Sequence, residues 1–162
     1  MRCMADSVYL ETSVISALFD ERPDPVCSAQ HQQTRQWYEE EGHNYDLFGS
    51  AMAIEELRTG QYDHQMEAVC FAEALKLLQV NDEVLGVSRI YIDRTAIPRS
   101  KLGDAVHLAA ASVHGMDYLL TWNCRHLANP NRVRQIAEIN RRLGLMTPVI
   151  ATPAMLYLED QP

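Results

Sequence analysis

Acidic and amide side chains recur in this chain beside segments expected to form strands and helices. Glu11 follows the apolar run SVYL, Glu55 and Glu56 lie in SAMAIEELRTG, Asp104 begins an Ala-rich segment, and Asn123 follows YLLT. Carboxylates held together repel, raise one another's pKa and are costly unless a divalent cation neutralises them. Oxygen ligands select hard ions such as Mg²⁺ or Mn²⁺, which bind phosphates and activate water. If these side chains come together in the folded chain, they predict a metal-dependent enzyme that hydrolyses phosphate esters.

Local sequence also allows a structural role for each of these residues. Adjacent helical residues project about 100° apart, so only one of Glu55 and Glu56 can point squarely into a shared site, and such a pair commonly forms a solvated face. Asp104 could simply be favoured at a helix start by unpaired amides and the helix dipole. His107 lies one turn after Asp104 and could orient it, although a histidine flanked by alanines is more often a core residue.

Hydrophobic patterning predicts how these residues are positioned. Short apolar runs alternate with helical stretches, which favours a parallel sheet covered on both faces. Strands are expected at residues 7–10, 45–48, 79–80, 118–121 and 148–151. Helices are expected at residues 14–19, 30–41, 50–58, 64–78, 82–93, 104–114 and 132–143. Thr12 or Ser13 would cap the first helix and Ser50 the third, while prolines and charges at 20–28 predict a loop. We therefore expect a three-layer α/β/α fold with a mainly parallel sheet of about five short strands, in one domain over residues 1–162.

Composition limits the classes of function. The net charge of −8 argues against a general nucleic-acid binder. Residues 1–83 hold 16 acidic and 5 basic residues, net −11, whereas residues 84–162 hold 6 and 9, net +3. The basic residues of the second half could line a phosphate-binding rim, and surface solvation explains them equally well. No apolar run approaches the length of a membrane span and the N-terminus lacks a secretory signal, so we expect a cytoplasmic protein. The four cysteines are far apart and are expected to be reduced.

Four segments of the chain, taken in order, resemble PIN-domain proteins of the VapC-like toxin type. VYLETSVIS resembles the opening strand and turn of that family, and SAMAIEELRTG resembles its Glu-Leu-Arg-x-Gly helix. GDAVHLAAASVHG resembles its Asp-Ala helix, and YLLTWNCRHL resembles its Leu-x-Thr-x-Asp/Asn strand end. The order and spacing of the four segments carry the resemblance, which covers nearly the whole chain.

The resemblance implies a PIN-like fold and a metal-dependent endoribonuclease, commonly the toxin of a toxin–antitoxin pair. The implied partners are an RNA substrate, a small antitoxin protein and a second copy of the chain in a homodimer. The catalytic positions of the family fall on Glu11, Glu56, Asp104 and Asn123. Within this set, Glu11 and Asp104 would bind Mg²⁺ or Mn²⁺ directly, and Glu56 would bind it through water or orient the nucleophile.

Further residues have supporting roles under the same resemblance. Thr12 or Ser13 would support Glu11. Glu55 remains an alternative to Glu56 as the residue of this helix that faces the site. Arg125 and His126 are candidates for contacts to phosphate.

Two positions depart from the usual pattern of the family. Glu11 replaces an Asp, and its extra methylene moves the carboxylate outward by about 1.5 Å. Asn123 supplies an amide oxygen without charge. These departures favour an alternative, a catalytically impaired PIN-fold module that binds an antitoxin or RNA. A phosphohydrolase acting on a small substrate is a third hypothesis, but the chain has no DxD motif and no Gly-rich phosphate loop.

Overall fold

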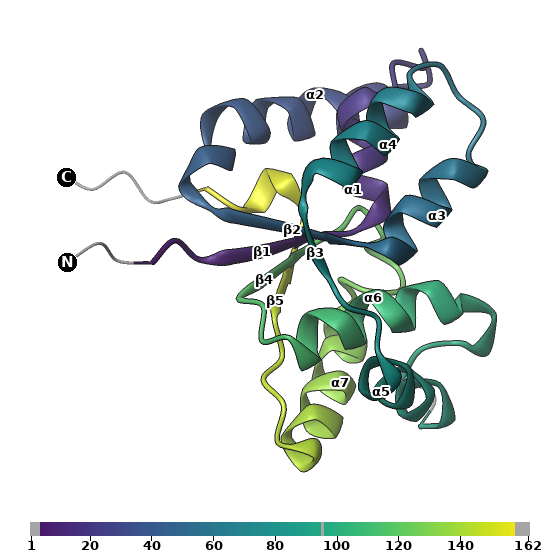
Figure 1. Ribbon diagram of the computed structural model, residues 1–162, viewed down its shortest axis with the longest axis vertical. Coiled ribbons are helices and arrows are strands. Elements are labelled where there is room, and N and C mark those ends of the chain that lie inside the picture. Colours follow the sequence, from purple (N-terminus) through teal and green to yellow (C-terminus); the bar gives the residue numbers. More distant parts are fainter. Residues whose placement is uncertain (1–3, 95, 158–162) are drawn as a thin grey trace.

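A computed structural model of the chain describes residues 4–94 and 96–157 (Figure 1). The strands are β1 (Ser7–Leu10), β2 (Asp46–Ser50), β3 (Lys76–Leu78), β4 (Tyr118–Leu120) and β5 (Val149–Ala151). The α-helices are α1 (Thr12–Phe19), α2 (Pro25–Glu40), α3 (Ala51–Thr59), α4 (Gln65–Ala74), α5 (Asp82–Asp93), α6 (Leu102–Val113) and α7 (Pro130–Leu143). Short 3₁₀ helices lie at Gly42–Asn44, Arg99–Lys101 and Pro153–Met155.

The five strands form one sheet in the order β3-β2-β1-β4-β5, and every pairing is parallel. From β1 the chain crosses to β2 and β3 on one side, and then returns to place β4 and β5 on the other. The direction of strand order therefore reverses between β1 and β4. In open parallel sheets, ligands bind outside the carboxyl ends of the strands at such a switch point. The residues that follow β1 and β4 accordingly lie where a ligand site is expected.

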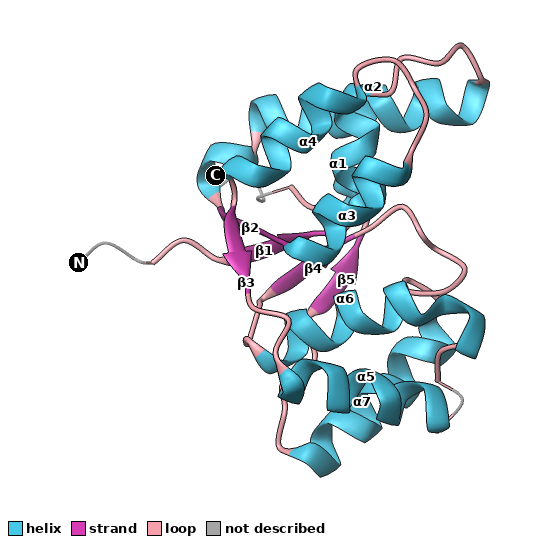
Figure 2. Cartoon of the chain, turned by 45° about the vertical axis from the view of Figure 1, so that its right-hand side comes forward, coloured by secondary structure: helices cyan, strands magenta, loops and turns pink. Residues whose placement is uncertain are grey.

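Helices cover both faces of the sheet (Figure 2). Parallel crossovers are right-handed, so crossovers that move in opposite directions place their helices on opposite faces. One face packs against α1 to α4, with Val8 and Leu10 of β1 in that core. The other packs against α5 to α7, and Tyr9 of β1 points into it. The expected three layers are observed, and the alternation along β1 is the reason that a single strand contributes to both cores.

The helix ends explain much of this arrangement. The Ser50 hydroxyl accepts from the backbone N–H of Ala53 at 3.3 Å, which confirms the predicted cap of α3. Gly115 follows the last turn of α6 with φ of 67°, and Gly144 closes α7 with φ of 71°. Left-handed backbone of this kind is favourable for glycine and ends a helix sharply. The turn at Gly115 leads the chain from α6 into β4.

Three predictions about local structure were wrong. Residues 20–28 are not all loop, because α2 begins at Pro25, where a missing N–H costs nothing, and Asp24 caps it. The cap of α1 is Glu11 rather than Thr12 or Ser13. The helix expected at 64–78 ends at Ala74, where the backbone of Leu75 turns extended, and the third strand is therefore Lys76–Leu78 rather than 79–80.

No helix in the described part of the chain is both long and apolar enough to cross a membrane. Cys27, Cys70 and Cys124 are free thiols, as expected. The corresponding prediction for Cys3 falls outside the described residues.

Candidate metal-binding site

Glu11 stands at the carboxyl end of β1, in the first position before α1, and is 4% exposed. Its Oε2 accepts hydrogen bonds from the backbone N–H of Ser13 at 3.2 Å, from the Ser13 hydroxyl, and from the Thr121 hydroxyl at 2.8 Å. These three donors come from two chain segments that flank the switch point. They hold one carboxylate oxygen in place, while Oε1 lies 4.0 Å from Nε2 of His107.

Glu56 reaches the same place from α3, which packs on the same face of the sheet as α1. Its Oε1 accepts a hydrogen bond from Nε2 of His107 at 2.8 Å. Partial burial by itself would raise the pKa of Glu56, but the hydrogen bond and the charge of His107 hold that pKa below its usual range. The neighbouring Glu55 is exposed and pairs instead with Arg58 at 2.8 Å. The structure thus brings Glu56 to Glu11 and leaves Glu55 outside.

His107 is fully buried on α6 and connects several groups. Its Nδ1 lies 2.6 Å from the hydroxyl of Tyr9, and its Nε2 lies 3.2 Å from the hydroxyl of Thr12 in addition to Glu56. Burial alone would lower the pKa of His107, but the hydrogen bond to Glu56 and the nearby charges, Glu11 first among them, raise it above its usual value. We expected His107 to orient Asp104. Instead, the hydrogen bonds of His107 go to Glu56, Tyr9 and Thr12.

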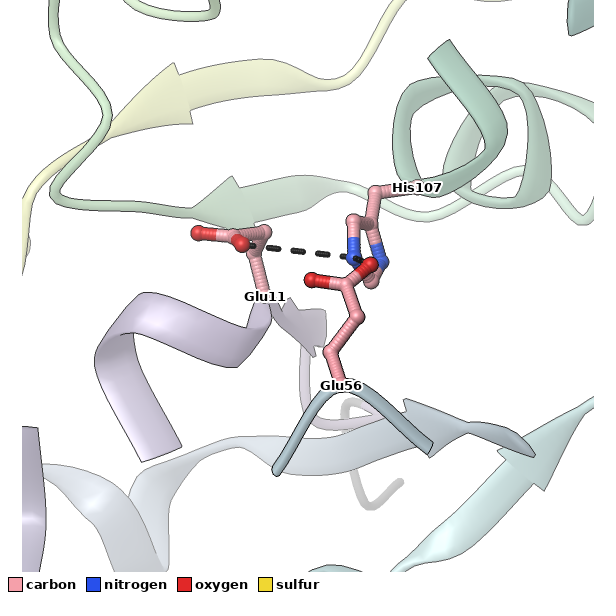
Figure 3. A group of neighbouring side chains, drawn as sticks. All are labelled: Glu11, Glu56 and His107. Atoms are coloured by element: carbon pink, nitrogen blue, oxygen red, sulfur yellow. Dashed lines mark hydrogen bonds and ion pairs between the residues drawn. The ribbon is translucent and has the colours of Figure 1, made fainter. Parts of the chain in front are cut away.

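Within the described residues, Glu11, Glu56 and His107 form a group that could hold a metal ion. Each offers one ligand atom, and these atoms all lie within 4.8 Å of one another. Figure 3 shows the three side chains pointing toward one another from the end of β1, from α3 and from α6. The Glu11 and Glu56 carboxylates supply oxygen donors that suit a hard divalent cation such as Mg²⁺ or Mn²⁺, so these residues fit such an ion.

Asp104 and Asn123 lie beside this group. The side-chain amide of Asn123 donates to Oδ2 of Asp104 at 2.9 Å. Burial, followed by the charge of Glu11, raises the pKa of Asp104. Asp104 is not one of the three residues within 4.8 Å of one another, so the predicted ligand set of Glu11, Asp104 and Glu56 differs from that group in this one member.

The loop after β4 carries the two residues expected to contact phosphate. The backbone N–H of His126 donates to Oδ1 of Asn123 at 3.2 Å, and the charge of His126 acts to lower the pKa of Asp104. Arg125 is exposed at the surface of the same loop. Both residues therefore lie on the chain segment that joins Asn123 to α7.

Two residues of this network, Thr121 and Tyr9, were not among the predicted site residues. Thr121 is fully buried and donates to Glu11, and Tyr9 contacts His107 from the middle of β1. A threonine directly after an apolar strand is a usable signal, because its hydroxyl points to the same edge as Glu11. Tyr9 gave no such signal, since an aromatic residue in a buried strand is ordinary.

Comparison with known proteins bears on the fold. No family model matches the chain, and no curated protein matches its sequence. Among solved structures, the chain is similar to a chain in the crystal structure of VapBC2 from Rickettsia felis bound to a DNA fragment from their promoter. The TM-score is 0.56 with 12% sequence identity, over 90% of this chain and 97% of the other. At this identity the similarity concerns the fold, and it confirms that the chain adopts the expected three-layer α/β/α PIN-like fold.

Proposed function

We propose that this protein is a metal-dependent endoribonuclease that hydrolyses RNA phosphodiester bonds, and that it is the toxin of a toxin–antitoxin pair. The observation that carries the proposal is the convergence of Glu11 and Glu56 beside Asp104 at the switch point of a PIN-like sheet. Glu11 is itself buried, and a buried carboxylate near two others is expensive in the absence of a cation. A bound cation would offset this free-energy cost, which is the reason to expect that the cluster binds one.

The proposed cation is Mg²⁺ or Mn²⁺, held by Glu11 and Asp104, with Glu56 acting through water or orienting the nucleophile. When bound, such a cation stabilises charge on the phosphate and activates water. Ser13 and Thr121 fix the Glu11 carboxylate by hydrogen bonds to Oε2. Thr12 contacts His107 behind the cluster.

The loop after β4 completes the proposed site. Asn123 holds Asp104 through the 2.9 Å hydrogen bond. Arg125 and His126 would contact the RNA backbone beside it, which gives a chain of net charge −8 a local means of attracting phosphate.

The fold neighbour is described as VapBC2 bound to a promoter DNA fragment. By analogy we propose a small antitoxin protein as a partner of this chain. A homodimer, a cytoplasmic location and a single domain over residues 1–162 belong to the same proposal.

A second function is favoured by two specific observations. Asn123 is neutral, and Glu56 is already hydrogen-bonded to His107, so the cluster carries less uncompensated charge than three free carboxylates would. A catalytically impaired PIN-fold module that binds an antitoxin or RNA has these properties too. The two functions differ in whether the protein binds a divalent cation tightly.

The deciding experiment is a calorimetric titration of the metal-free protein with Mn²⁺, followed by cleavage assays on structured RNAs. The variants are Asp104→Asn and Glu56→Gln, with Glu55→Gln as a matched control because Glu55 is adjacent but faces Arg58. We expect Asp104→Asn to abolish binding and cleavage and Glu55→Gln to leave both intact. Cleavage that survives Asp104→Asn in clean protein would exclude the proposed metal-dependent mechanism at this site. Absence of Mn²⁺ binding with retained partner binding would support the impaired module.

A further inference from the structure

A line of hydrogen-bonded polar side chains links β2, β1, α6 and α3 and ends at Glu56. It begins at Ser50, whose hydroxyl lies 2.7 Å from the hydroxyl of Tyr9. Tyr9 lies 2.6 Å from Nδ1 of His107, and Nε2 of His107 lies 2.8 Å from Oε1 of Glu56. The first three residues are at most 1% exposed, whereas the Glu56 side chain is 36% exposed. The line therefore connects the interior of the protein to the one member that can meet solvent.

The Glu56 carboxylate at the end of this line determines where the proton on His107 lies. A carboxylate can only accept hydrogen bonds, so Nε2 of His107 must carry a proton and donate it to Glu56. A protonated Nε2 has no lone pair to offer a cation. The other nitrogen is occupied by Tyr9, and Tyr9 is held in turn by Ser50, which also caps α3, the helix that carries Glu56.

Gly103, on the same helix as His107, also confines Glu56. A Cβ atom added to Gly103 would lie 2.9 Å from Oε1 of Glu56, which is closer than real Cβ contacts come. The same oxygen is therefore bounded by the His107 imidazole and by the bare backbone of the residue before Asp104. Glu56 occupies a slot between two positions of α6, Gly103 and His107, that are one turn apart.

We propose that His107 is a positioning residue, which directs the Glu56 carboxylate toward Glu11 through Nε2–H, while Tyr9 and Ser50 fix the imidazole and Gly103 leaves room for the carboxylate. The inference rests on the proposed function, because it assigns a purpose to Glu56 at the metal site. It gives His107 a role other than that of a ligand, although the imidazole lies within 4.8 Å of both carboxylates. It also differs from a purely structural role, in which the buried histidine would serve stability alone.

Two substitutions of His107 separate these roles. In His107→Gln the amide nitrogen can occupy the place of Nε2 and donate to Glu56. In His107→Asn the shorter amide reaches only toward Tyr9. Residues that orient metal ligands typically contribute 10- to 100-fold in metal affinity. We expect His107→Asn to weaken Mn²⁺ binding and RNA cleavage by about 10- to 100-fold, and His107→Gln to restore most of both.

Gly103→Ala tests the slot without altering the histidine. Alanine is favoured over glycine in a helix by about 1 kcal/mol, so thermal stability should be equal or higher. The added methyl group would displace Glu56, and we expect Mn²⁺ affinity and cleavage to fall, as in His107→Asn. A loss of function with unchanged or increased stability is not what a purely structural role predicts. This variant also keeps the proposal testable if the His107 variants do not fold.

Two spectroscopic measurements complete the experiment. Electron paramagnetic resonance of the Mn²⁺-loaded protein should show no directly coordinated nitrogen, and a coordinated imidazole nitrogen would overturn the inference. Nitrogen NMR of the metal-free protein should show a protonated His107 Nε2 whose shift changes in Glu56→Gln. An unprotonated Nε2, or equal losses in His107→Gln and His107→Asn, would also overturn it. If the wild-type protein binds no Mn²⁺, the proposed function fails, and the NMR result still decides whether His107 holds Glu56.

Discussion

The side-chain amide of Asn123 donates a hydrogen bond to Oδ2 of Asp104 at 2.9 Å. It joins the loop after β4 to the first turn of α6, 19 residues away in the sequence. Burial, and after it the charge of Glu11, raises the pKa of Asp104, and the neutral amide of Asn123 donates to this carboxylate without adding another negative charge. The departure of Asn123 from an acidic residue therefore has a structural consequence that can be tested.

Replacing this donor with a carboxylate should lower the stability of the metal-free protein and raise its affinity for Mn²⁺. In Asn123→Asp the hydrogen bond to a charged acceptor, a contribution of about 1.5–3 kcal/mol, becomes a like-charge contact. We expect the metal-free variant to unfold at a temperature several degrees lower and to bind Mn²⁺ more tightly than the wild type. Thermal unfolding and calorimetry with and without Mn²⁺ measure the two effects. Unchanged stability together with unchanged Mn²⁺ affinity would contradict this account.

Because the pKa of Asp104 is raised, removing its charge should stabilise the metal-free protein by an amount that depends on pH. Because the folded pKa lies above the unfolded value, Asp104 favours the folded state below the unfolded pKa and disfavours it as pH rises through the folded pKa. Asp104→Asn should therefore raise the unfolding temperature of the metal-free protein at pH 7, and the gain should shrink as pH falls toward 4. Thermal scans across this range measure it. A gain that is independent of pH would show that the charge of Asp104 is not the cause.

Thr121 should contribute to both folding and metal binding. Its buried hydroxyl donates to Oε2 of Glu11 at 2.8 Å and also accepts from the backbone N–H of Asn123 at 2.9 Å. Thr121→Val keeps the shape of the side chain and removes both bonds. We expect a loss of about 1.5–3 kcal/mol in unfolding free energy, and a 10- to 100-fold weaker Mn²⁺ affinity. Denaturant unfolding and calorimetry would show these losses, and Thr121→Ser, which retains the hydroxyl, should recover affinity.

Arg125 offers a test of phosphate contact that is separate from the cation. It is exposed on the loop after β4, so Arg125→Ala should leave folding and Mn²⁺ affinity unchanged. RNA binding should weaken across sequences, and the slope of log affinity against log salt should fall by about one. Binding measured with a noncleaving Asp104→Asn background at several salt concentrations gives this slope. An unaltered slope would remove Arg125 from the RNA-binding surface.

A second buried polar cluster should affect stability alone. Asn140 of α7 accepts from the Tyr91 hydroxyl at 2.6 Å, and its amide donates to Ser112 at 3.1 Å and to Thr147 at 3.0 Å. Tyr91→Phe leaves the Asn140 oxygen with one partner fewer, which costs about 1–3 kcal/mol. We expect the folded variant to keep the Mn²⁺ affinity of the wild type. A parallel loss of affinity would mean that the α5 to α7 layer is coupled to the site.

Much of the fold could be predicted from the sequence. The residues at 7–10, 82–93 and 118–120 are strand or helix as predicted, because buried strands are short apolar runs and because helices repeat their apolar positions. Local signals placed Ser50 as a cap and the end of the last long helix at residue 143, where α7 ends. The error at Pro25 arose because proline is compatible with a first helical turn, so the same residue serves a loop and a helix start.

The sequence by itself determined which carboxylates end or begin elements, since that depends only on neighbours in the chain. The tertiary structure decided which of them meet. Helical periodicity alone does not distinguish Glu55 from Glu56, although the family resemblance favoured Glu56. The packing of α3 beside α6 turns Glu56 to His107 and leaves Glu55 to pair with Arg58. Likewise His107 was within reach of Asp104 on its own helix, but partners from β1 and α3 take its hydrogen bonds. Contacts between elements depend on how the sheet and helices pack, and local periodicity carries no information about that packing.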